Sequence, residues 1–133
     1  MFHSVAHIRA ALDAAASLGA GFTLRTAPGA IHYAGPLYLL KLVETAFAER
    51  PPPANMRVRA LLDCGDDAAL AYAALRTGWR ALLFTGPARV RVQLAATARR
   101  HAAVLEHRPS PALDLLDHPD PPSACLDWLA AGR

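Results

Sequence analysis

The sequence predicts an α/β protein in which about four parallel strands alternate with helices, arranged as a half-barrel or as a three-layer sheet. Short apolar runs of strand length recur along the chain, and each is followed by glycine, proline or aspartate. Between these runs, apolar residues fall at steps of three and four, which is the spacing of a helix that buries one face. Strands separated by single helices pair in parallel through right-handed crossovers, and 133 residues suit one hydrophobic core.

The first half of the chain contains two predicted helices and the first strand. A helix is expected over residues 4–18, with Ser4 as its N-cap and Gly19 as its stop. A strand over residues 22–26 follows, and Pro28-Gly29 ends it. The second helix runs from about Pro36 to Glu49, where three consecutive prolines forbid its continuation.

The second half repeats this alternation. A strand over residues 58–62 leads through Cys64-Gly65 into a helix that Asp66 or Asp67 can cap and that ends at Gly78. The chain then continues with a strand over residues 81–85, an arginine-rich helix to about His101, and a fourth strand over residues 103–106.

We expect residues 1–108 to form the α/β domain and residues 109–133 to form a proline-rich tail packed on the same domain. The tail carries a short helix over residues 123–130, on which Trp128 and Leu129 are expected to bury apolar surface against the core.

The charge balance argues against a nucleic-acid partner. The net charge is +3, and 13 of the 14 basic residues are arginines spread along the chain. Arg89, Arg91, Arg99 and Arg100 cluster on one predicted helix, for which a solvated face is favoured over an anion or nucleic-acid patch.

The expected compartment is the cytoplasm, without membrane contact. No apolar stretch approaches the ~20 residues that cross a bilayer, and the N-terminal segment has no signal-peptide pattern. Cys64 and Cys125 are far apart in the sequence and have none of the short spacings of zinc or redox motifs, so no disulfide is expected.

Several segments together resemble the class II fructose-bisphosphate aldolases, the metal-dependent TIM-barrel family that includes the tagatose-bisphosphate aldolases. They are, in order, ALDAAASLGAGFTLRTAPGAIHYAG, the Leu-Leu-x-x-Val-Glu helix at residues 39–44, LLDCG at residues 61–65, and residues 74–84. The resemblance covers residues 8–106 and about half of a family barrel, so it implies a half-TIM-barrel.

The resemblance also implies roles for individual residues. Asp63 takes the position of the catalytic acid/base aspartate, and Cys64 replaces the adjacent zinc-ligating histidine. Thr26 stands in place of a serine near the substrate phosphate, and Glu106 matches an acidic residue of a later strand. Catalytic zinc needs three protein ligands and an open position, and Cys64 is the single candidate here. We therefore expect no cofactor, with zinc as the alternative.

These observations leave three functions open. The first is a non-catalytic, aldolase-like binding or interaction module with a pocket around Thr26, Asp63, Cys64, Thr85 and Glu106, taking a small phosphorylated or carbonyl ligand. The second is a small metal-dependent aldehyde-lyase whose site is completed across a dimer interface. The third is a structural subunit, which an exposed apolar patch beside Trp79 or Trp128 would indicate. A half-barrel leaves open edges and an apolar inner face, so a homodimer is expected.

Overall fold

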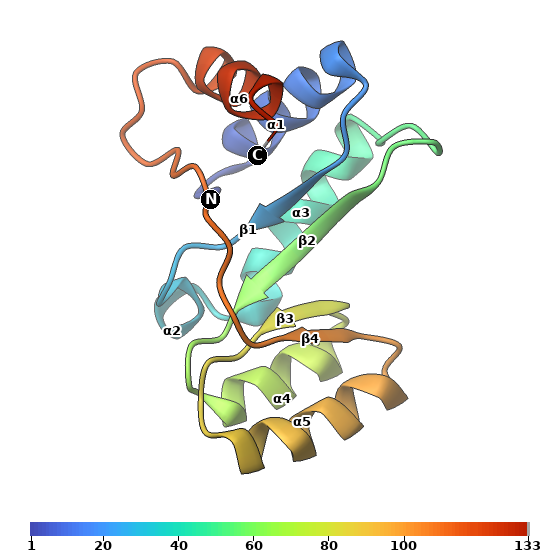
Figure 1. Cartoon of the computed structure of the whole chain (residues 1–133), viewed down its shortest axis with the longest axis vertical. Coiled ribbons are helices and arrows are strands. Elements are labelled where there is room, and N and C mark those ends of the chain that lie inside the picture. Colours follow the sequence, from blue (N-terminus) through green and yellow to red (C-terminus); the bar gives the residue numbers. More distant parts are fainter. Residues whose placement is uncertain (133) are drawn as a thin grey trace.

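The computed structural model describes residues 1–132 and shows one sheet of four strands alternating with six helices (Figure 1). The strands lie in the order β1-β2-β3-β4, and all three neighbouring pairs are parallel. The predicted α/β fold is therefore confirmed. The elements are α1 (Val5–Leu18), β1 (Phe22–Arg25), α2 (Ala30–Ala34), α3 (Pro36–Glu49), β2 (Val58–Asp63), α4 (Ala68–Thr77), β3 (Ala81–Leu83), α5 (Ala88–Arg100), β4 (Val104–Glu106) and α6 (Pro121–Ala130).

Local signals in the sequence set the helix ends. The Ser4 hydroxyl accepts a hydrogen bond from the His7 N–H at the start of α1, and Gly19 ends that helix with φ 63°. At α4 the N-cap is Asp67 rather than Asp66, and its carboxylate accepts from the Leu70 N–H at 3.0 Å.

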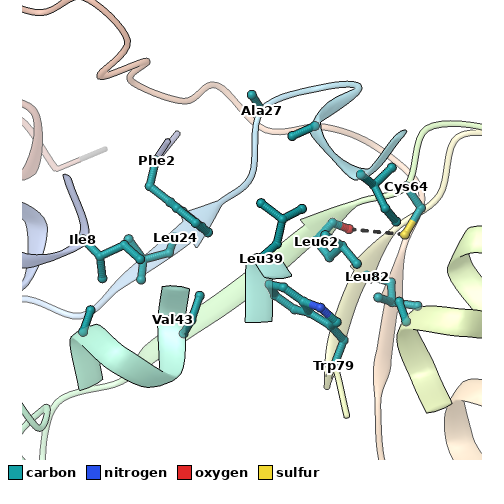
Figure 2. Close-up of a cluster of buried hydrophobic side chains, with 14 of the residues drawn as sticks. Phe2, Ile8, Leu24, Ala27, Leu39, Val43, Leu62, Cys64, Trp79 and Leu82 are labelled. Carbon is teal, nitrogen blue, oxygen red and sulfur yellow. Dashed lines mark hydrogen bonds between the residues drawn. The ribbon is translucent and has the colours of Figure 1, made fainter. Parts of the chain in front are cut away.

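The two faces of the sheet have different surroundings. Leu24, Leu62 and Leu82 point to one face, where Figure 2 shows them with Ile8 of α1 and with Leu39 and Val43 of α3. Phe84 and residues of α4 and α5 belong to the same main hydrophobic core. The alternate positions point to the opposite face, which we call the helix-free face. It carries Thr23, Arg25, Arg59, Leu61, Asp63, Ala81, Leu83, Val104 and Glu106.

The helix-free face has a small apolar cluster of its own. Leu61, Ala81 and Leu83 are buried there together, and no helical residue belongs to their cluster. Since α3, α4 and α5 lie on the other side, the sheet has one layer of helices. This corresponds to the half-barrel alternative rather than to three layers.

Several boundaries differ from the predicted ones. β1 ends at Arg25, and Thr26 forms an isolated parallel bridge with Phe2. β3 ends at Leu83. The Phe84 N–H still donates to the Glu106 carbonyl of β4 at 2.9 Å, but the Thr85 N–H donates to the Gly65 carbonyl, outside the strands, at 2.8 Å. Helix α2 was not predicted, since five residues are too few to show a helical period. Helix α6 begins earlier than expected, at Pro121.

The tail packs against the first part of the chain. After β4 the chain runs back toward the N-terminus, and α6 lies beside α1 (Figure 1). The Leu115 N–H donates to the Met1 carbonyl at 3.1 Å, and Leu115 and Cys125 are buried in the main core. Trp128 and Leu129 are half-buried, so they anchor α6 less deeply than Cys125 does.

The remaining surface predictions concern arginines, tryptophan and the membrane. Arg89, Arg99 and Arg100 are exposed on α5 and Arg91 is half-buried, while the helix buries Leu94 and Ala98. The preference for a solvated face over an anion patch stays a prediction. Trp79 is buried, and its Nε1–H donates to the Pro36 carbonyl at 2.8 Å. None of the helices formed by residues 1–132 is long and apolar enough to cross a membrane.

Candidate functional site

Thr26 and Asp63 lie together at the carboxyl ends of β1 and β2. The Asp63 N–H donates to Thr26 Oγ1 at 2.9 Å, and Thr26 is fully buried. Asp63 is 7% exposed, and its Oδ1 accepts from the Gly65 N–H at 3.0 Å. The Thr26 hydroxyl therefore holds the two strand ends together instead of facing a ligand.

Cys64 points away from Asp63, into the main core. Figure 2 shows its sulfur among buried side chains, 3.7 Å from the Leu62 carbonyl oxygen. Burial raises the pKa of the Cys64 thiol to about 12, and the nearby carboxylates of Asp63 and Asp67 act in the same direction. Metal ligation requires the thiolate, so this environment favours a packing role. Among residues 1–132, no three His, Cys, Asp or Glu side chains are grouped to hold a metal ion.

Thr85 and Glu106 complete the set predicted from the sequence. Thr85 is exposed beyond the end of β3. Glu106 lies on the helix-free face, where its Oε1 accepts from Arg59 Nη2 at 2.5 Å. The five predicted residues thus do not enclose one pocket, because Cys64 points into the main core and Thr26 is buried away from solvent.

A cavity of about 570 Å³ lies where the helix-free side of β1 and β2 meets the tail and helix α6. This volume falls within the range of roughly 300–1,000 Å³ that is usual for small-molecule sites. Of the five predicted residues, Glu106 alone lines it. The residues that give the cavity its chemistry are Arg25, Arg59, Glu106, Leu113, Trp128 and Leu129.

Arg25 and Arg59 are the binding candidates that sequence reasoning missed. Each is a charged residue within a short apolar strand, at a position that alternates with core residues. That alternation was the available signal, because a strand buried on both faces reads as continuously apolar. The two arginines indicate that the second face of the sheet is polar in part.

His3 links the N-terminal segment to the tail, and the histidines of residues 1–132 belong to no group that could hold a metal ion. His3 Nε2 lies 2.7 Å from Asp114 Oδ1, and the His3 N–H donates to His7 Nδ1 at 3.1 Å. Burial, followed by the neighbouring His3, lowers the pKa of His7. His32 Nε2 lies 3.5 Å from Asp67 Oδ2 at the strand ends, with His32 exposed. These pairs hold loops in place.

No family model matches the chain, and no curated protein matches it either. The likeness to class II aldolases therefore stays a prediction from the residues quoted above.

Proposed function

We propose that this chain is a non-catalytic binding module of aldolase-like descent, which takes a small molecule in the cavity on the helix-free face. The observation that carries the proposal is the cavity itself, because it combines an apolar wall from the tail with the charged groups of Arg25, Arg59 and Glu106. A cytoplasmic location belongs to the same proposal, since both cysteines are free and buried.

The position of Asp63 supports binding over catalysis. Asp63 does not line the cavity, and one of its carboxylate oxygens already accepts a backbone hydrogen bond. A general base must reach the proton that it removes, within about 3 Å or through one water. A ligand held against Arg25 and Arg59 contacts residues other than the inferred catalytic aspartate.

The binding proposal is tested by filling the cavity. Thr23 is exposed and lines the cavity, so Thr23→Trp adds an indole ring without removing a core contact. We expect at least one member of a panel of aliphatic carboxylates, phosphate monoesters and aldehydes to raise the Tm of the parent protein. The same compound should not change the Tm of the Thr23→Trp variant. Thr45→Trp, on the exposed side of α3, serves as the control and should respond like the parent. Equal responses of all three proteins, or no response from the parent, would overturn the proposal.

A separate assay addresses the lyase alternative. The purified protein is incubated with fructose 1,6-bisphosphate and added zinc, and triose phosphates are measured. We expect no cleavage above the background of the buffer. Cleavage that Asp63→Asn abolishes would refute the non-catalytic assignment, and stoichiometric zinc that is lost in Cys64→Ser would favour the lyase.

A further inference from the structure

We propose that the cavity on the helix-free face binds an amphipathic monocarboxylate, with Arg25 holding the carboxylate and the tail covering the apolar body. This inference rests on the proposed binding function and names the chemical class of its ligand.

The first observation is that, among residues 1–132, no acidic side chain forms an ion pair with Arg25. Its Nη1 donates to the Ser110 carbonyl at 2.8 Å, and its Nη2 lies 3.4 Å from the Met1 sulfur. Its Nε is buried and has no hydrogen-bond partner among the described residues. A half-buried guanidinium that contacts only neutral atoms is costly, because desolvation of its charge is not compensated. A bound anion would supply that compensation.

The second observation is the charge of the cavity wall. Arg59 is paired with Glu106, so among the described lining residues Arg25 is the one side chain whose full charge has no ionic partner. The Met1 amino group also lines the cavity, but it donates to the Leu113 carbonyl and interacts electrostatically with the Asp114 carboxylate. One uncompensated positive charge matches one negative charge, so a monoanion fits better than a phosphate dianion.

The third observation is the apolar part of the cavity wall. Leu113, Leu115, Trp128 and Leu129 line the cavity from the tail and α6. Burial of apolar ligand surface against such a wall stabilises a complex by roughly 25 cal/mol per Å². The planar fork of arginine pairs with both oxygens of a carboxylate, so the two walls together select an acid with an apolar body.

Octanoate is the probe that tests this class. It is titrated into the full chain by isothermal calorimetry, with octan-1-ol and octyl phosphate as ligands of equal chain length and different charge. We expect octanoate to bind more tightly than either. We also expect Arg25→Gln to weaken octanoate binding roughly tenfold or more, the loss typical of a charged hydrogen bond. Arg89→Gln, at an exposed site on α5, is the matched control and should bind octanoate like the parent.

The outcomes separate this inference from the proposed function. Equal binding of octanoate and octan-1-ol, or unchanged binding in Arg25→Gln, overturns the inference. Tighter binding of octyl phosphate also overturns it while leaving a binding module in place. If Arg25→Gln does not fold, Arg25→Lys takes its place, and it should weaken octanoate binding while keeping the charge. If none of the three ligands binds and the panel used with Thr23→Trp also fails, the proposed function falls as well.

Discussion

At the end of β1, one hydroxyl group holds two strands together. Thr26 is fully buried, and its Oγ1 accepts from the Asp63 N–H at 2.9 Å. Thr26→Val keeps the shape of the side chain and removes the acceptor, which leaves a buried N–H without a partner. We expect a loss of about 1–3 kcal/mol in the free energy of unfolding, measured by urea denaturation. Thr23→Val, at an exposed position of the same strand, should change that free energy by less than about 0.5 kcal/mol. Similar unfolding free energies for the two variants would show that the Thr26 hydroxyl does not contribute to stability.

Cys64 gives the protein a specific dependence on alkaline pH. Its pKa is about 12 in the folded protein, against 9.0 for an ordinary thiol. Below pH 9 the thiol is protonated in both states and this contribution to stability is complete. Between pH 9 and 12 the unfolded thiol ionises while the folded one does not, so stability falls as pH rises.

The slope of this loss can be measured with a variant. We expect the parent protein under reducing conditions to lose stability more steeply above pH 9 than Cys64→Ala, with a difference approaching about 1.4 kcal/mol per pH unit. Burial also raises the pKa of Cys125, which contributes equally to both proteins and cancels in the comparison. Parallel stability curves for parent and variant would contradict the buried, protonated state of Cys64.

At the scale of elements, the tail is part of the folded core. Leu115 is 4% exposed and packs in the main core, whereas its neighbour Leu116 is 54% exposed. Leu115→Ala should therefore cost about 2–5 kcal/mol of unfolding free energy, the range for a buried leucine. Leu116→Ala should cost less than about 0.5 kcal/mol. Urea denaturation of both variants makes the comparison, and a small effect of Leu115→Ala would mean that the tail folds apart from residues 1–108.

The order of elements could be predicted from the sequence because capping and turn residues mark where the elements begin and end. Ser4, Gly19 and Gly78 fix helix ends through local backbone geometry, and the expected bounds of α3 agree with the structure. The short helix α2 was missed, since its buried residues Ala30 and Ile31 are too few to form a pattern.

The site was harder to predict than the fold. Strand ends could be located from the sequence, but whether Thr26 and Cys64 are sealed depends on packing by segments distant in the chain. The cavity is an extreme case, because it forms only where the tail meets the helix-free face. Arg25 contacts Ser110 across 85 positions of sequence, and no local pattern encodes that contact.

At the scale of the whole molecule, the sheet is covered unevenly. One face is packed against helices, while β4 pairs only with β3 among the described residues and presents Val104 at 53% exposure on the helix-free face. A strand with one unpaired edge and an exposed apolar side chain is a template for association with another chain. A second copy of this protein would bring an equivalent edge and face, which is the basis of the predicted homodimer.

Val104 and Val92 allow this prediction to be tested with one type of substitution. Both valines are exposed, Val104 on β4 and Val92 on α5 at 67%. We expect the parent protein to sediment as a dimer at micromolar concentrations. Val104→Lys should shift it to monomer, because a lysine in the interface would bury an unpaired charge. Val92→Lys should leave the dimer intact, since α5 presents a solvated arginine face there. A parent that sediments as a monomer throughout this range would contradict the dimer, and dissociation by Val92→Lys alone would place the interface on α5.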